Sequence, residues 1–226
     1  MAIEENYRRV LQEVREAEAA CGRPAGSVRI VGVTKTVGRN SVDRGYAVGL
    51  RDFGENRVQD AKEKFTPPLA PDASLHLIGY LQTNKARDAV ALFDTIHSVD
   101  RSELIQALER RAALIDKTLK ILIQVNIAAE AQKHGCEPSE TADLVRQTAE
   151  SPHLEICGLM TIAPLVADPE TARPVFRALR ELKDQTSALD DRFTLPELSM
   201  GMTNDYVVAI QEGATIVRVG RAIFAE

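Results

Sequence analysis

The sequence has no tryptophan, and only 4% of its 226 residues are aromatic. Its net charge is −5, and its basic residues occur in scattered pairs, such as Arg8-Arg9 and Arg110-Arg111, without a stripe interleaved with aromatic side chains. Proteins that bind nucleic acids usually carry a concentrated basic surface, because contacts to phosphates supply much of the affinity. We therefore expect no nucleic-acid partner.

Long apolar runs are also missing. No run approaches the ~18 consecutive apolar residues of a membrane-spanning helix. Residues 1–5 are acidic and amphipathic, and they have neither the basic start nor the apolar centre of a signal peptide. These absences predict a cytoplasmic protein with no membrane partner.

Cysteines are few and far apart in the sequence. Cys21, Cys136 and Cys157 form an odd set, which predicts free thiols in a reducing compartment. The run His134-Gly135-Cys136 has no second His/Cys cluster to accompany it, so we expect no metal site.

What the sequence does contain is a regular alternation of strand and helix patterns. Residues 3–21 have apolar side chains at helical spacing and end before Gly22 and Pro24, which predicts a helix. Eight short apolar runs then predict strands, at 28–33, 51–54, 75–78, 95–99, 119–126, 154–158, 195–199 and 215–219. Helical patterns lie between them, at 40–48, 56–65, 84–92, 101–115, 139–149, within 169–189, and at 205–211. Only a short tail, 221–226, follows the last strand.

Eight strand–helix units predict a parallel sheet closed into a (β/α)₈ TIM-type barrel. We expect one domain over residues 1–226, with the helix of residues 1–22 packed on the barrel. The second possibility is an open doubly wound sheet. That fold normally carries a glycine-rich loop after its first strand, and Thr34-Lys35-Thr36 is not one.

Active sites of such barrels form at the carboxyl ends of the strands. Lys35 follows the first strand, where a dry barrel mouth would lower the pKa of its amine and make it a nucleophile suited to Schiff-base formation. The alternative is a solvated loop lysine. Asn56 follows the second strand, either as a ligand contact or at the start of a helix.

The last two strands end in loops of small residues, Ser199 to Thr203 and Gly220-Arg221, where barrels often hold a phosphate. Arg218 lies within the last strand, among apolar residues. A buried guanidinium needs a partner, so we expect either a structural ion pair, for example with Glu197, or a contact to a ligand.

Seven motifs together resemble the family of pyridoxal phosphate homeostasis proteins. They occur in the order of that family and span nearly the whole chain: VTKT (33–36), FGENRVQ (53–59), HLIGYLQTNK (76–85), QVNI (124–127), GLM (158–160), LSMGM (198–202) and VRVGRAIF (217–224). The resemblance implies a fold similar to the N-terminal barrel of alanine racemase and a role in the homeostasis of pyridoxal 5′-phosphate (PLP).

The resemblance also implies roles for individual residues. Lys35 would carry PLP as a Schiff base, and Arg218 would face the pyridine nitrogen. The remaining implied contacts are to the phosphate and the pocket lining, from Ser199, Gly201, Gly220 and Arg221, and from Asn56 and Met200. Arg221 departs from the family, which most often has Thr or Ser there, so a hydroxyl contact to phosphate is lost or replaced by a cation.

Two functional classes remain open at this point. The first is a PLP-binding protein without dedicated turnover, with PLP-dependent apo-enzymes as candidate recipients. The second is a single-domain amino-acid racemase. We favour the first, because the chain ends at Glu226 and leaves no residues for the second domain of barrel-type racemases, and only Tyr80 is positioned as a second base. We expect a monomer, because the helices show no apolar stripe beyond core needs. A sugar-phosphate enzyme using Lys35 is a more distant alternative.

Overall fold

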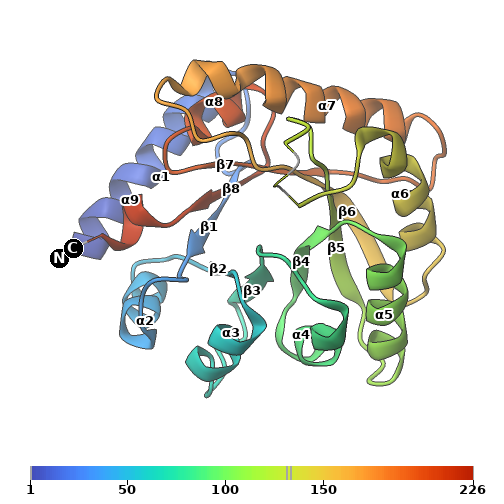
Figure 1. Ribbon diagram of the computed structural model, residues 1–226. Helices are drawn as coiled ribbons and strands as arrows, with labels where there is room; N and C mark the ends of the chain where they lie inside the picture. The colour runs from blue at the N-terminus through green and yellow to red at the C-terminus, as the bar shows by residue number, and fades with distance from the viewer. Residues whose placement is uncertain (1, 131, 133, 226) are drawn as a thin grey trace.

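In a computed structural model that describes residues 2–130, 132 and 134–225, eight parallel strands form a closed barrel (Figure 1). Each strand pairs with the next in sequence, and β8 pairs with β1. The closed barrel confirms the predicted fold class. The strands are β1 (Arg29–Val33), β2 (Asp52–Glu55), β3 (Ser74–Leu77), β4 (Thr95–Val99), β5 (Leu119–Gln124), β6 (Leu154–Met160), β7 (Glu197–Met202) and β8 (Ile216–Val219).

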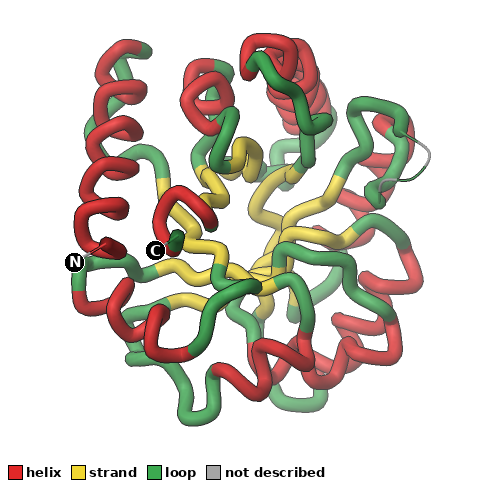
Figure 2. Tube along the Cα trace, turned by 60° about the vertical axis from the view of Figure 1, so that its left-hand side comes forward, coloured by secondary structure: helices red, strands yellow, loops and turns green. Residues whose placement is uncertain are grey.

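Helices surround the strands on the outside of the barrel (Figure 2). They are α1 (Ala2–Ala20), α2 (Arg39–Ala47), α3 (Val58–Lys64), α4 (Ala86–Leu92), α5 (Ser102–Ala113), α6 (Thr141–Ala149), α7 (Arg173–Ser187), α8 (Tyr206–Gln211) and α9 (Arg221–Phe224). None of these described helices is both long and apolar enough to cross a membrane. The sequence predicted only a tail after the last strand, whereas residues 221–224 form a single helical turn.

The helix α1 is amphipathic and covers one side of the barrel. Its buried side chains, among them Ile3, Val10 and Val14, recur at helical spacing and face the core. It packs against α2, α8 and α9. The amide of Asn6 donates to the carbonyl of Ala225 at 3.0 Å, so the two ends of the chain lie side by side (Figure 1). The helix α9, which the local sequence did not reveal, thus lies in contact with α1.

The strands present two different faces, because successive side chains point to opposite sides of a sheet. On the outer face, residues such as Leu75 and Leu77 join a large apolar core shared with the helices. Inside the barrel, a separate small apolar cluster is formed by Val31, Leu122, Cys157, Met160 and Ile216. The interior also holds buried polar side chains, among them His76, His97 and Arg218, which is unusual for a packed barrel core.

The strand β7 starts later than the sequence predicted. The predicted strand covered residues 195–199, but β7 runs over Glu197–Met202. Pro196 precedes it, since proline has no N–H to donate to a ladder. The pairing of β7 with β8 is irregular between Ser199 and Met202, and Gly201 has a φ of +92°. The other predicted strands overlap the observed ones.

Close packing of β6 against β7 predicts the effect of a single methyl group. A Cβ on Gly158 would lie 1.9 Å from the carbonyl oxygen of Glu197, on the paired strand. We expect Gly158→Ala to lower the free energy of unfolding by about 2 kcal/mol or more, because two strands must separate. Denaturant unfolding measures this. The control is Gly38→Ala, where a Cβ meets nothing within 4 Å and the change should stay below about 1 kcal/mol. Equal effects of the two variants would contradict the packing argument.

Candidate functional site

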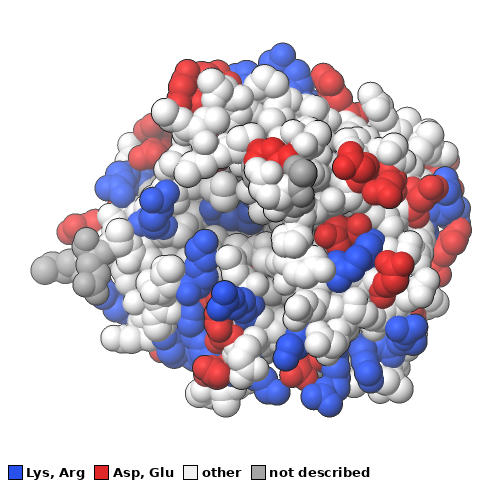
Figure 3. All heavy atoms as spheres, in the orientation of Figure 1, with Lys and Arg blue, Asp and Glu red and all other residues white. Residues whose placement is uncertain are grey.

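A cavity of about 480 Å³ opens at the carboxyl ends of the strands. This is the end where barrel enzymes build their sites. A recess with basic side chains at its floor is visible on this face in Figure 3. The lining includes residues that follow or end β1, β2, β3, β5, β7 and β8: Val33, Lys35, Asn56, Ile78, Gly79, Tyr80, Gln124, Met202, Thr203, Asn204, Asp205, Arg218, Gly220 and Arg221.

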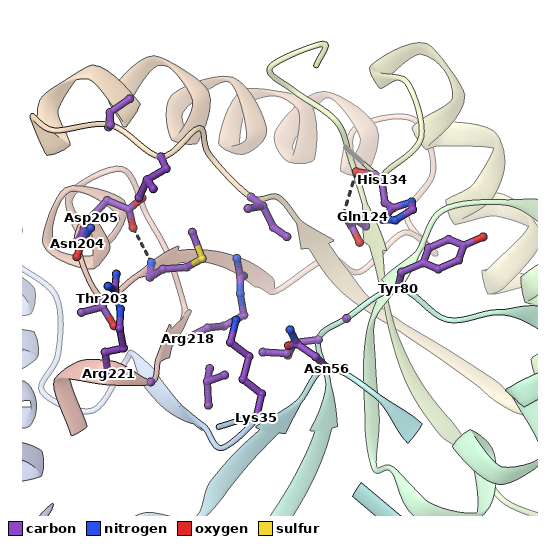
Figure 4. A pocket seen from close by; sticks show the side chains of 18 of the residues that line it. Lys35, Asn56, Tyr80, Gln124, His134, Thr203, Asn204, Asp205, Arg218 and Arg221 are labelled. Atoms are coloured by element: carbon purple, nitrogen blue, oxygen red, sulfur yellow. Dashed lines mark hydrogen bonds between the residues drawn. The ribbon is translucent and has the colours of Figure 1, made fainter. Parts of the chain in front are cut away.

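Lys35 enters the cavity from the end of β1 (Figure 4). The residue before it is fixed from two sides. The hydroxyl of Thr34 donates to Oε1 of Glu55 at 2.6 Å, and Nζ of Lys64 donates to the carbonyl of Thr34 at 2.6 Å. Lys64 also donates to Oε1 of Glu55 at 2.6 Å, forming an ion pair with a fully buried carboxylate. This clamp holds the backbone that presents Lys35.

Asn56 lines the cavity next to β2, and its backbone lies very close to Gly79 (Figure 4). A Cβ on Gly79 would lie 2.2 Å from the carbonyl oxygen of Asn56, so only glycine fits there. The hydroxyl of Ser98 donates to the carbonyl of Gly79 at 2.6 Å. The second and third strand-end loops are therefore packed into one rigid wall.

Arg218 is a buried cation at the floor of the cavity, and it is only 4% exposed. Its guanidinium donates to the hydroxyl of Ser199 at 2.7 Å and to the carbonyl of Thr161 at 2.9 Å. Both acceptors are neutral, and no carboxylate of the described residues lies within ion-pair distance. Burial lowers the pKa of Arg218 to about 10, against the opposing effect of Asp205.

The predicted alternative of an ion pair between Arg218 and Glu197 is wrong. Glu197 instead pairs with Arg29 at 2.5 Å and accepts from the hydroxyl of Thr215. Glu197 is the first residue of β7, at the opposite end of the barrel from the cavity, whereas Arg218 is the third residue of β8. The charge of Arg218 is thus left facing the cavity.

Two loops meet at one end of the cavity. The N–H of Met202 donates to Oδ1 of Asp205 at 2.6 Å, which closes the loop after β7 around Thr203 and Asn204. Burial raises the pKa of Asp205, while the Met202 N–H and the charge of Arg218 oppose that rise. Gly220 and Arg221 come from the loop after β8. Together the loops offer a hydroxyl, an amide and a guanidinium to an anion.

The structure brings five of the eight predicted binding residues to the cavity wall: Lys35, Asn56, Arg218, Gly220 and Arg221. The other three do not line it. Ser199 is fully buried and contacts Arg218 from within the barrel, and Met200 belongs to the core shared with the helices. A Cβ on Gly201 would lie 2.6 Å from Cβ of Ala209, so this glycine allows α8 to pack closely. Direct ligand contacts by these three residues stay predictions.

The far wall of the cavity was not predicted. Tyr80 stacks on His134 with ring centroids 4.0 Å apart, and the guanidinium of Arg101 lies 5.0 Å from the centroid of Tyr80. The amide of Gln124 donates to the carbonyl of His134 at 3.0 Å (Figure 4). Sequence motifs contained Tyr80 and Gln124, but no local signal links the loops after β3 and β5.

The clamp below Lys35 generates a test. We expect Lys64→Met to lower the free energy of unfolding by about 3 kcal/mol, because it leaves the buried carboxylate of Glu55 without its cation. Lys62→Met is a matched control on the same helix, since Lys62 pairs with Asp88 at the surface at 3.3 Å. That change should cost less than about 1 kcal/mol. Denaturant unfolding measures the loss of unfolding free energy in both variants. Similar losses in the two would refute the special role of the Glu55–Lys64 pair.

Comparisons with solved structures support the geometry. A protein from Bifidobacterium adolescentis has a TM-score of 0.90 and 37% identity, covering 99% of this chain and 94% of that one. PipY from Synechococcus elongatus, solved with PLP bound, has a TM-score of 0.81 and 35% identity, covering 94% of this chain and all of that one. Alanine racemase from Corynebacterium glutamicum shares the fold at 14% identity, with a TM-score of 0.67, over 95% of this chain and 60% of that one.

Sequence comparisons identify the family. The family model for the alanine racemase N-terminal domain matches residues 2–226. The pyridoxal phosphate homeostasis protein of Aquifex aeolicus is 40% identical over 222 residues, covering 98% of this chain and 97% of that protein. The human protein of the same name is 35% identical over 97% of this chain and 84% of its own length. The chain therefore belongs to the family of pyridoxal phosphate homeostasis proteins, within the larger family of alanine racemase N-terminal barrels.

Proposed function

We propose that this chain binds PLP and serves in its homeostasis, with Nζ of Lys35 joined to the aldehyde carbon of PLP as a Schiff base. The observation that carries the proposal is that an amine, from Lys35, and a buried guanidinium, from Arg218, face the same cavity. Lys35 is the single lysine among the described residues that line the cavity, and Arg218 has no carboxylate partner among them. PLP matches both features, since it has an aldehyde and an aromatic nitrogen with a lone pair.

The phosphate of PLP would lie at the end where the two loops meet. Thr203 and Asn204 supply a hydroxyl and an amide, and Arg221 supplies a positive charge. Arginine binds phosphate through charge-assisted hydrogen bonds, which are stronger than those of a neutral hydroxyl. We infer that Arg221 takes the place of the hydroxyl that the family resemblance implies at this position. Contacts from Ser199 and the backbone at Gly201 remain part of the proposal.

Arg218 would face the ring nitrogen of the cofactor. Bound PLP supplies an electron sink, and its strength depends on protonation of the ring nitrogen. A guanidinium, which stays charged and only donates hydrogen bonds, keeps that nitrogen unprotonated. Arg218 therefore favours holding the cofactor over using it in carbanion chemistry.

We infer that the chain stores PLP and hands it to PLP-dependent apo-enzymes, without dedicated turnover. The curated relatives are named for homeostasis, which supports this choice. Tyr80, the candidate second base of a racemase, is 43% exposed and stacked on His134 at the outer wall. We further propose that it acts as a monomer in the cytoplasm. Its three free cysteines fit a reducing compartment.

The proposal predicts a specific spectrum. Addition of PLP to the purified protein should produce a visible absorption band that persists after gel filtration, and Lys35→Ala should abolish it because the amine is gone. Lys85→Ala is the matched control, since Lys85 is an exposed lysine outside the cavity. A band of equal strength in Lys35→Ala, or none in the unmodified protein, would refute the assignment of Lys35.

The same samples separate the binding protein from the racemase. The protein with bound PLP is incubated with L-alanine, and D-alanine is measured by chiral chromatography. We expect none above the level of the Lys35→Ala variant. Formation of D-alanine that depends on Lys35 would establish the racemase instead.

A further inference from the structure

A chain of polar side chains crosses the inside of the barrel below the cavity. Each member contacts the next: Arg218 Nη1 to Ser199 Oγ at 2.7 Å, Ser199 Oγ to His97 Nδ1 at 2.9 Å, His97 Nε2 to His76 Nδ1 at 3.0 Å, and His76 Nε2 to Asp52 Oδ1 at 2.9 Å. The residues come from β8, β7, β4, β3 and β2. The chain therefore joins the cavity floor to the opposite end of the barrel.

The members between the two ends are sealed from water. His76, His97 and Ser199 are each no more than 1% exposed. Asp52 begins β2 and its side chain is 19% exposed, at the end of the barrel away from the cavity. Buried polar groups must satisfy their hydrogen bonds within the protein. This requirement allows the protons to be assigned from the geometry.

Donor and acceptor counting gives one consistent arrangement. An arginine only donates and an ionised aspartate only accepts, so the two ends have fixed roles. His76 must then donate from Nε2 to Asp52 and accept at Nδ1. His97 must donate from Nε2 and accept at Nδ1 from the hydroxyl of Ser199, which in turn accepts from Arg218. Every donor and acceptor along the chain is used once, in a single direction.

The reverse arrangement fits less well. If His76 carried both protons, His97 would donate from Nδ1 to Ser199. The hydroxyl oxygen of Ser199 would then accept from both His97 and Arg218, and its own proton would have no acceptor among the contacts of the described residues. A second buried positive charge would also lie in the barrel that already holds Arg218, which is costly.

We propose that His76 and His97 are positioning residues that hold Arg218 at the cavity floor through an ordered hydrogen-bond chain anchored on Asp52. In this chain both imidazoles are neutral and both carry their proton on Nε2. The consequence for ligand binding rests on the proposed function, whereas the hydrogen-bond chain itself does not.

The surroundings of the chain support neutral imidazoles. Burial holds the pKa of His97 well below its ordinary value, and His76, Arg218 and Arg29 act in the same direction. Asp52 is the acidic group in direct contact with the chain. At the same end of the barrel, Arg29 pairs with Glu197 at 2.5 Å and lies 4.0 Å from Asp52, while Asp94 accepts from the N–H of Leu75. Aligned hydrogen bonds polarise and strengthen one another. The chain therefore strengthens the hydrogen bond from Arg218 to Ser199, which orients the guanidinium.

Nitrogen NMR of the cofactor-free protein tests the chain directly. The sequence has four histidines, and ¹⁵N labelling of the rings shows which nitrogen of each is protonated. We expect two rings in the Nε2–H form at neutral pH, and we expect His97 to keep this form as the pH is lowered, because burial holds its pKa well below the ordinary value. His134 and His153 lie outside the chain and are assigned with His134→Gln and His153→Gln. A buried ring that is protonated on Nδ1, or doubly protonated at neutral pH, overturns the proposal.

Variants at His76, which does not line the cavity, test the effect on Arg218. His76→Leu removes both contacts of the ring, whereas His76→Asn offers an amide oxygen to His97. In the cofactor-free protein, the guanidinium N–H signals of Arg218 should exchange faster with water in His76→Leu, and His76→Asn should restore part of the protection. Cys157→Ala, in the apolar cluster of the barrel interior, is the matched control. Unchanged exchange in His76→Leu, with the fold intact by circular dichroism, overturns the positioning role.

Binding of PLP gives the functional readout. We expect His76→Leu to bind PLP about tenfold more weakly, as loss of support for a charged hydrogen-bonding group predicts. If the unmodified protein binds no PLP, the proposed function fails, while the NMR result still tests the hydrogen-bond chain. If His76→Leu and the unmodified protein bind PLP equally well, the positioning role fails while the proposed function stands.

Discussion

The burial of Arg218 inside the barrel is the constraint on which the site depends. A buried guanidinium is tolerated only when its donors are satisfied, because an unpaired buried charge is costly. Here the acceptors are the hydroxyl of Ser199 and a backbone carbonyl, and neither neutralises the charge. The positive charge is therefore available at the cavity floor, in the same cavity as Lys35, the one lysine among the described residues of the wall. Loops from the last two strands complete a site for an anionic ligand.

The architecture of the barrel explains how such a charge is supported. One part of the barrel interior is an apolar cluster, with Val31, Leu122 and Cys157 packed together. Another part carries the polar chain through His97 and His76. A closed barrel makes this possible, since residues far apart in sequence point to the same interior. The same closure lets the clamp of Glu55 and Lys64 hold the segment that presents Lys35.

Most of the fold could be predicted from the sequence, because alternating strand and helix patterns with short connections leave few arrangements. The number of strands and the barrel closure are confirmed. The details that failed depend on tertiary contacts. The short helix α9 is tied to α1 through Asn6, and β7 continues to Met202 through an irregular pairing with β8 near Gly201. Neither contact has a signal in the local sequence.

The candidate site could be predicted for residues that directly follow a strand. It could not be predicted for side chains whose contacts depend on how deep they lie inside the barrel. Lys35, Asn56, Gly220 and Arg221 follow strands, so their place at the wall came from the strand pattern. Ser199 has the same kind of local sequence but lies one layer deeper, below the guanidinium. The contact between His76 and His97 could not be predicted from the sequence. Only the closed barrel brings side chains of β3, β4 and β7 into a common interior.

The most direct test of this account is to locate the residue that PLP modifies. The protein is mixed with PLP, reduced with borohydride, digested, and analysed by mass spectrometry. We predict that the pyridoxyl group is found on Lys35, at close to one group per chain. Labelling spread over several exposed lysines, or a single label on another lysine, would contradict the assignment of this cavity as the PLP site.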